Sequence, residues 1–341
     1  MNWLLWILAL ISLGVPVGSL TIDRIFGVPA RLQWKVWGIP SLIAFLVALF
    51  GGLALKNGVA ELILWGIVSG ILATAALDVV RLFGHHVLHA FPLDMPQMFG
   101  TIAYGLAPQL QRNVMGQMVK FLSEVPEAQR RMMLAERLRA IAGLREPLRL
   151  AVVGAMQRGL AQLPEDRRQK VMDTQMDLMA ELAPEQRRTL LAAMDAAMDG
   201  RASTVYAQPR GLPPIPMQLV RRFMAVALPQ TWREAGLSPA RPILAGYIWH
   251  FSIGVTFAIT YNLLFGQGTW ALAFGWGAFV WLAMMIAMPL MMPLITFPWW
   301  FPIVPFIAHM AMAIPIGYVA LNLLSPAAHA ASLVGALGWL P

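Results

Sequence analysis

The chain of 341 residues contains no cysteine and very little charge. The absence of cysteine excludes disulfide bonds, thiolate metal sites and cysteine nucleophiles. Charged residues make up 12% of the sequence and hydrophobic residues 58%, whereas a soluble domain carries about 25% charged residues. This composition excludes an ordinary soluble enzyme and predicts a protein that crosses a membrane several times.

Charge is missing altogether from the last part of the chain. Residues 242–341 include no Asp, Glu, Lys or Arg. Buried carboxylates carry protons and cations in many pumps and transporters, so their absence argues against a cation-coupled carrier whose site lies in these helices. The sequence also lacks glycine-rich phosphate loops, zinc-protease motifs, nucleophile elbows and dinucleotide-binding fingerprints. These absences favour a protein that is not an enzyme.

Six apolar runs are long enough to cross a hydrocarbon layer of about 30 Å. They cover residues 2–20, 36–55, 62–83, 243–265, 270–292 and 303–324. The sequence therefore predicts an all-α, polytopic membrane protein with six transmembrane helices and an inserted α-helical cytoplasmic domain. The expected parts are residues 1–106 (three transmembrane helices), 107–200 (the insert), 201–242 (a proline-rich linker and an interfacial helix), 243–325 (three transmembrane helices) and 326–341 (an apolar tail on the surface).

The distribution of charge predicts the orientation. The first loop carries Arg24, Arg31 and Lys35 against Asp23, and the loop after the third run, residues 84–242, carries 20 Lys and Arg against 14 Asp and Glu. Basic loops stay on the cytoplasmic side, so the insert is expected to be cytoplasmic and both termini outside, in a bacterial or archaeal cytoplasmic (inner) membrane. In this setting a net charge of +8 indicates topology and contact with membrane lipid, not nucleic acid.

The insert has the periodicity of amphipathic helices. Apolar residues recur at helical spacing, for example at Leu134, Leu138 and Ile141. Proline–glutamate pairs predict three helix starts, because proline suits the first helical position and glutamate faces the positive end of the helix dipole. These pairs begin at Pro126, Pro164 and Pro184.

A further apolar stripe in the insert consists of Met172, Met176 and Met179. Its spacing predicts that all three methionines face the core. Downstream of the insert, residues 219–228 include Arg221 and Arg222 among apolar neighbours. This segment is predicted as a basic helix that lies either on the membrane surface or against the insert.

The third and fifth apolar runs open alike, with Gly66 and Gly70 in one and Gly275 and Gly277 in the other. Small residues at such spacing allow helices to approach closely in lipid. The helix that follows each run contains a histidine and, further on, an Asn-Leu-Leu triplet. We therefore predict two parallel repeats, the third helix with the fourth and the fifth with the sixth.

The pattern formed by Gly66, Gly70, Thr74 and Asp78, by MPQMFG at residues 95–100 and by Trp249-His250-Phe251 resembles a family of small prokaryotic membrane proteins of uncharacterised function. Members of that family typically have four helices. The likeness covers residues 62–106 and 243–324. It implies a helical membrane fold and no particular reaction. This chain departs from the family by its first two apolar runs and by its large insert.

His85, His86 and His89 form the densest cluster of possible ligands in the sequence. On a continuous helix His85 and His89 would share one face with Asp78, and the i, i+4 spacing of two imidazoles suits a metal such as copper or zinc. The alternative is that the histidines lie in the headgroup zone and that Asp78 pairs with Arg81 at i, i+3.

His250 and His309 occupy matching places in the two predicted repeats. Facing one another, they could ligate haem iron or copper, or contact a quinone. The alternative is that each is a neutral histidine bonded to a backbone carbonyl or to a polar neighbour.

Three functions follow from these patterns. The first is a membrane accessory or assembly protein whose cytoplasmic helices dock another membrane or cytoplasmic protein, with a homo-oligomer as a further possibility. The second is a membrane protein that binds a metal or haem through His85, His89, His250 and His309. The third is a transporter of an uncharged or lipidic substrate.

Overall fold

The computed structural model describes residues 2–91, 94–199, 212–292 and 295–339. About 82% of it is helical, which confirms the predicted all-α class. The chain forms two compact units. The membrane unit comprises residues 1–104, 240–291 and 298–341, and the insert unit comprises residues 105–239 and 292–297.

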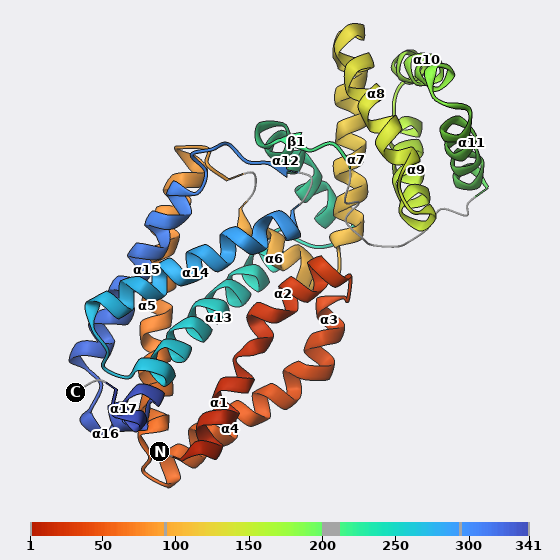
Figure 1. Ribbon diagram of the computed structural model, residues 1–341. Coiled ribbons are helices and arrows are strands. Elements are labelled where there is room, and N and C mark those ends of the chain that lie inside the picture. The colour runs from red at the N-terminus through yellow and green to blue at the C-terminus, as the bar shows by residue number, and fades with distance from the viewer. Residues whose placement is uncertain (1, 92–93, 200–211, 293–294, 340–341) are drawn as a thin grey trace. The chain divides into compact units, whose positions relative to one another are not determined.

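The membrane unit is built from helices that run mainly side by side (Figure 1). In chain order they are α1 (Trp3–Ser12), α2 (Gly14–Phe26), α3 (Ala30–Gln33), the π-helical turn η1 (Trp34–Gly38), α4 (Ile39–Ala54), α5 (Gly58–His86), α6 (Met95–Ala103), α13 (Ala240–Phe265), α14 (Trp270–Met291), α15 (Ile303–Asn322), α16 (Pro326–Ala331) and α17 (Leu333–Leu337).

Five helical stretches are long and apolar enough to cross a membrane. They are Ala30–Ala54, Gly58–His86, Ala240–Phe265, Trp270–Leu290 and Ile303–Asn322. Many large apolar side chains on these stretches are exposed, as expected of surfaces that face lipid.

The first apolar run, residues 2–20, differs from the predicted continuous helix. It is interrupted at Leu13, between the end of α1 at Ser12 and the start of α2 at Gly14. Glycine weakens a helix, and Pro16 lacks the N–H that a continuing helix would need. Because the interrupted run is shorter than a full span, five long apolar stretches are found among the described residues, where the sequence predicted six.

Two tryptophans anchor this interrupted segment to α13. The indole N–H of Trp6, on α1, donates to the carbonyl of Leu263 at 3.0 Å. In the other direction, the indole N–H of Trp249, on α13, donates to the carbonyl of Pro16 at 2.7 Å. Each bond satisfies a polar group in apolar surroundings, which stabilises the contact between the segment and α13.

Helices α5 and α13 approach so closely that glycine is required at their contact. A Cβ atom added to Gly66 would lie 2.7 Å from the Cα of Ile259, and one added to Gly70 would lie 2.5 Å from the Cα of Val255. The predicted role of these two glycines in helix packing is therefore confirmed. The same close approach brings the polar ends of α5 and α13 together.

Each helix pair that the sequence suggested as a repeat packs side by side, α5 with α13 and α14 with α15. In the second pair Gly277 carries the contact, since a Cβ atom there would lie 2.7 Å from the carbonyl oxygen of His309. Gly275 has open space around it. The duplication itself stays a prediction.

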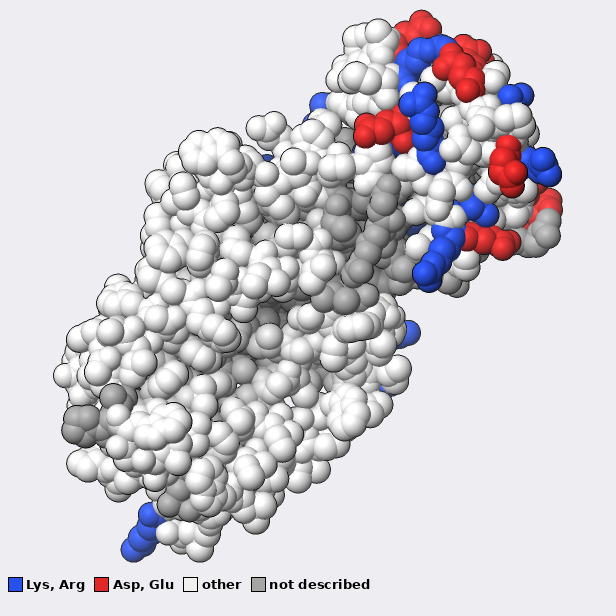
Figure 2. Space-filling model, in the orientation of Figure 1, with Lys and Arg blue, Asp and Glu red and all other residues white. Residues whose placement is uncertain are grey.

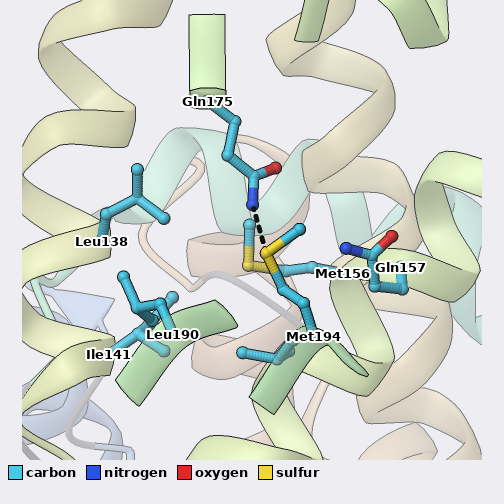
Figure 3. Close-up of a pocket in the computed structure, with 8 residues that line it drawn as sticks. Leu138, Ile141, Met156, Gln157, Gln175, Leu190 and Met194 are labelled. Atoms are coloured by element: carbon cyan, nitrogen blue, oxygen red, sulfur yellow. Dashed lines mark hydrogen bonds between the residues drawn. The ribbon is translucent and has the colours of Figure 1, made fainter. Parts of the chain in front are cut away.

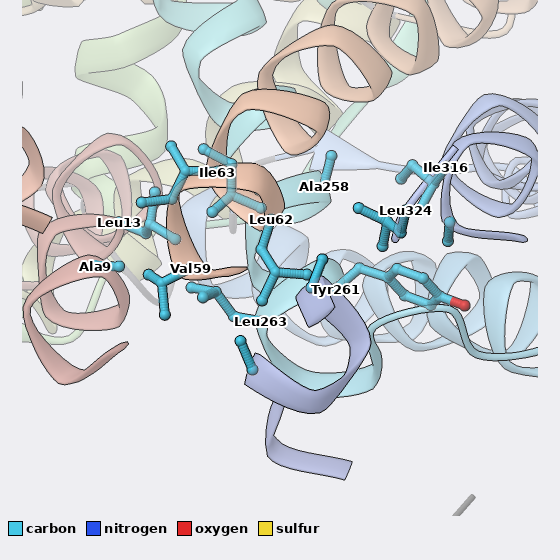
Figure 4. Close-up of a cluster of buried hydrophobic side chains, with 14 of the residues drawn as sticks. Ala9, Leu13, Val59, Leu62, Ile63, Ala258, Tyr261, Leu263, Ile316 and Leu324 are labelled. Atoms are coloured by element: carbon cyan, nitrogen blue, oxygen red, sulfur yellow. The ribbon is translucent and has the colours of Figure 1, made fainter. Parts of the chain in front are cut away.

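The core of the membrane unit lies where α5, α13 and α15 meet (Figure 4). Leu62 and Ile63 from α5, Tyr261 from α13 and Ile316 from α15 are fully buried. The apolar tail closes one end of this core. Ser325, immediately before the tail, donates from its backbone N–H and from its hydroxyl to the carboxylate of Glu61, at 2.7 and 2.6 Å.

In its described residues the insert unit has six helices and one pair of very short strands (Figure 1). They are α7 (Ala107–Glu124), α8 (Glu127–Ala142), α9 (Glu146–Ala161), α10 (Glu165–Glu181), α11 (Pro184–Met198), β1 (Ile215–Pro216), α12 (Met217–Glu234) and β2 (Ile295–Thr296). Strands β1 and β2 are parallel, with Ile215 opposite Ile295. The three predicted helix starts are confirmed to within one residue, at Glu127, Glu165 and Pro184.

The insert unit has an apolar core of its own. Its buried side chains come from α7 to α11: Val119, Leu122, Leu134, Leu138, Ile141, Val152, Leu160, Val171, Leu178, Met179 and Leu190. One small hollow remains among α8, α9, α10 and α11 (Figure 3). There the side-chain amide of Gln175 donates to the sulfur of Met194 at 3.7 Å. At about 10 Å³ the hollow has room for little more than one water molecule and is no ligand site.

The predicted methionine stripe of α10 is only partly buried. Met179 is in the core, but Met172 and Met176 are 39% and 52% exposed. Val171 and Leu178 take the inward positions instead. The prediction that all three methionines face the core is therefore wrong for Met172 and Met176.

Helix α12, the basic helix predicted downstream of the insert, packs against α7. The rings of Phe121 and Phe223 lie 5.8 Å apart. At the end of α12 the amides of Gln109 and Asn113 donate to Glu234, and these bonds lower the pKa of that carboxyl. Of the two positions left open by the sequence, the structure shows the one against the insert.

Candidate functional site

A cluster of ionisable side chains lies in the membrane unit where α5, α6 and α13 meet. Asp78 and Arg81 are on α5, Asp94 immediately precedes α6, and Tyr247 and His250 are on α13. Asp78 and Arg81 are three positions apart on α5, and Tyr247 and His250 are three positions apart on α13. The two side chains of each pair therefore point to the same face of their helix. We call these five residues the buried ion network.

Arg81 is the centre of the buried ion network. Its Nε–H donates to Oδ1 of Asp78 at 2.6 Å, one terminal nitrogen donates to Asp94, and the other lies 3.4 Å from the hydroxyl of Tyr247. Asp78, Arg81 and Asp94 are 7%, 4% and 9% exposed. The pairing of Asp78 with Arg81, one of the two alternatives from the sequence, is thereby confirmed.

His250 extends the network through the same carboxylate oxygen of Asp78 that Arg81 contacts. Its Nε2 lies 3.0 Å from Oδ1 of Asp78. The ring of Phe99, on α6, lies 6.0 Å from the imidazole and covers it. A neutral His250 with a proton on Nε2 donates a hydrogen bond to Asp78, and a protonated His250 forms an ion pair with it.

The charges of the network set what it can do. Two carboxylates face one guanidinium, so the cluster carries one net negative charge while His250 is neutral and none when His250 is protonated. Charges inside a membrane protein are costly unless they are paired. The arrangement therefore clamps α5, α6 and α13 together through paired charges.

The premise that His85, His89 and Asp78 share one helical face is wrong, because α5 ends at His86. Beyond it the chain reverses: His89 adopts the left-handed conformation with φ of 55°, and the N–H of Ala90 returns to the carbonyl of Gly84 at 2.8 Å. The carboxylate of Asp78 already accepts a hydrogen bond from Arg81 and contacts His250. Throughout the described part of the chain, no three His, Asp or Glu residues are grouped so that they could hold a metal ion. Binding of copper or zinc stays a prediction.

His309, the second histidine of the predicted pair, lies on α15 and is 7% exposed. Its Nδ1 lies 2.7 Å from the carbonyl oxygen of Pro305, one turn earlier on the same helix. The structure thus shows the carbonyl-bonded histidine that was the alternative to a ligand. His250 and His309 each use one ring nitrogen for a protein contact, and a role for them in binding haem, quinone or metal stays a prediction.

Asp94 and Tyr247 are members of the site that were not predicted from the sequence. The feature of the sequence that could have indicated them is the small number of charged residues in α5. This helix has only three Asp, Glu, Lys or Arg residues, namely Glu61, Asp78 and Arg81. Two of these three lie one turn apart, and charges in an apolar helix require partners from neighbouring segments. Polar residues next to the following helices, such as Asp94 and Tyr247, were the available partners.

No protein-family model, no curated protein and no solved structure matches this chain.

Proposed function

We propose that this protein is a multi-pass component of a bacterial or archaeal cytoplasmic membrane that acts as an accessory or assembly factor and has no catalytic activity. In this proposal α1 and α2 together make a sixth crossing, and the insert unit docks a partner protein on the cytoplasmic side. The exposed methionines of α10 are the observation that carries the proposal.

Met172 and Met176 are four residues apart and lie on the outer face of α10. Neither belongs to the core of the insert unit, although that unit buries Met179 from the same helix. Exposed methionine is common at surfaces that bind other proteins, because its flexible thioether adapts to different apolar partners. Apolar side chains grouped on one helix face therefore favour a docking surface.

The surface around this face is suited to recognition. Figure 2 shows basic and acidic side chains intermixed over the insert unit, in contrast to the nearly uncharged face of the membrane unit. Arg131 pairs with Glu181 and lies 3.7 Å from Asp177, and Arg167 pairs with Glu124 at 3.1 Å. Exposed pairs of this kind contribute only about 0–1 kcal/mol to stability, so their main effect is on the choice of partner.

The test is a quantitative pull-down of the tagged full-length protein from membranes solubilised in mild detergent. Mass spectrometry should identify a stoichiometric partner with the wild-type chain. The double variant M172K/M176K should retain that partner at a level lower by about tenfold or more. The reason is that charges replace two apolar side chains that the partner covers in the complex. Deletion of residues 108–200 should abolish recovery.

A matched control introduces two lysines on the same unit but away from α10, at the exposed positions Gln162 and Ala192. Q162K/A192K should leave recovery of the partner unchanged, which separates the loss of the apolar face from the change in net charge. Recovery that is equal for M172K/M176K and wild type, with circular dichroism showing both folded, contradicts the proposal.

A further inference from the structure

A second site lies in the membrane unit, at the turn between α4 and α5. An open groove of about 580 Å³ runs there, lined by the end of α4, the start of α5 and Ala327 of the tail. This volume falls within the range of roughly 300–1,000 Å³ that is typical of small-molecule sites. The groove is distinct from the buried ion network and shares no residue with it.

One end of the groove carries opposite charges. Lys56 and Glu61 both line it, yet among the ion pairs of the described residues none joins these two. Lys56 is exposed and sits in the left-handed conformation, with φ of 48°. The groove therefore offers a cation and an anion held apart from each other.

Away from the turn the groove is apolar. Leu53, Leu64 and Val68 line it and are 48%, 44% and 43% exposed. Val68 is seven residues beyond Glu61 on α5, which corresponds to roughly 10 Å along the helix axis. A molecule that fills the groove must be charged at one end and apolar along the rest.

We propose that this groove binds one molecule of phosphatidylethanolamine. Its phosphate lies at Lys56, its ammonium group at Glu61, and the upper part of one acyl chain along Leu53, Leu64 and Val68. The two headgroup charges are complementary to the two side-chain charges, and the acyl chain covers apolar side chains at the depth where a lipid tail begins.

The contacts of Glu61 favour a primary amine over other headgroups. Each of its oxygens accepts one hydrogen bond from Ser325, at 2.7 and 2.6 Å, and keeps a second lone pair for another donor. A primary ammonium has three N–H donors, whereas a choline group has none and a glycerol headgroup adds no positive charge. The site should therefore prefer phosphatidylethanolamine to phosphatidylcholine and to phosphatidylglycerol.

Native mass spectrometry of the full-length protein in detergent tests this inference, with each of the three lipids titrated separately. We expect one saturable site with the highest affinity for phosphatidylethanolamine. Lys56→Gly removes the cation and places a residue that tolerates the left-handed backbone, so it should fold normally and weaken phosphatidylethanolamine binding by roughly five- to tenfold. Glu61→Gln should abolish the preference over phosphatidylcholine.

Two matched pairs of variants control for general effects. Lys35 is an exposed lysine outside the groove, and Lys35→Ala should leave binding unchanged. Val68→Trp fills the apolar end and should abolish retention of the lipid, whereas Val79→Trp, at an exposed position of the same helix outside the groove, should not.

Three results would each overturn the inference. They are equal affinity for the three lipids, equal loss of binding in the Lys35 and Lys56 variants, and undiminished binding to Val68→Trp that is monodisperse by size-exclusion chromatography. None of them bears on the docking of a protein partner by the insert unit.

Discussion

Arg81 is a single cation that serves two buried carboxylates, and the identity of the residue is important. Its planar guanidinium presents several donors in fixed directions, which allows Asp78 and Asp94 to bind at the same time. A lysine at this position would offer one compact charge and could not reproduce both contacts. Arg81 therefore ties α5 to Asp94, the residue that immediately precedes α6.

Replacing Arg81 by methionine should strongly destabilise the membrane unit. The substitution keeps the apolar stem but leaves Asp78 and Asp94 buried without a counter-charge, a situation that typically costs about 3–5 kcal/mol. The midpoint of thermal unfolding in detergent, followed by the intrinsic fluorescence of the tryptophans, should fall clearly. The charge-balanced triple variant R81M/D78N/D94N should recover a large part of the loss.

Arg241→Ala provides the control for this experiment, since Arg241 is an exposed arginine at the start of α13. Its unfolding midpoint should match that of the wild type. If R81M were as stable as R241A, the buried ion network would not hold the helices together, and its description as a clamp would be incorrect.

For single residues, the sequence predicted the contacts between side chains that are close together in the chain. The spacing of three residues was enough to expect the pairing of Asp78 with Arg81. The contacts with Asp94 and His250 join positions 13 and 172 residues apart, and no helical periodicity reports such contacts. The reversal at His89 was also missed, because the left-handed conformation there arises from how the chain turns back to Gly84.

Helix α5 needs glycine where it meets α13. Its glycines let the backbone of α13 approach so closely that a Cβ atom would not fit between the two helices. This contact positions Asp78 against His250. The geometry of the ion network thus depends on glycine positions two and three turns away from it.

Leucine at Gly70 should separate α5 from α13. The new side chain begins 2.5 Å from the Cα of Val255, so the backbones must move apart, and overpacking of this kind typically costs about 1–3 kcal/mol. The expected result is a lower unfolding midpoint together with loss of a disulfide engineered between the two helices.

The matched variant is Gly275→Leu on α14, where an added Cβ atom meets no atom within 4 Å. It should be neutral or slightly stabilising, since leucine favours a helix by roughly 1 kcal/mol over glycine. Equal destabilisation by both leucines would show that the close approach of α5 and α13 is not what Gly70 provides.

Elements were predicted well where one pattern dominated, and poorly where two patterns competed. The helix starts at Glu127 and Glu165 followed from proline and glutamate. On α10, however, the stripe formed by Val171 and Leu178 competes with the stripe formed by Met172 and Met176, and periodicity alone cannot say which faces inward. Packing against α8 and α7 decides in favour of Val171 and Leu178.

For the molecule as a whole, the orientation in the membrane is open to direct measurement because the chain contains no cysteine. A single cysteine introduced at exposed Glu185 of the insert unit should react with a membrane-impermeant maleimide only after cells are permeabilised. One introduced at exposed Ala330, in the tail that packs at the start of α5, should react in intact cells.

The reverse labelling pattern would place the insert unit outside the cell and remove the cytoplasmic partner from the proposed function. The charge rule on which the orientation depends does not need the first apolar run to be a complete span. Arg31 and Lys35 belong to the stretch Ala30–Ala54, and the two spans that follow the first loop already return the chain to the same side.

The pairing of β1 with β2 includes residues 292–297, the connection between α14 and α15, in the insert unit. The chain therefore passes between the two units four times, after residues 104, 239, 291 and 297. An ordinary inserted domain hangs from one pair of covalent links and can be cut out with a single splice. Here two pairs of covalent links join the insert unit to the rest of the chain, and one pair leads directly into α14 and α15, so the unit cannot be cut out with a single splice.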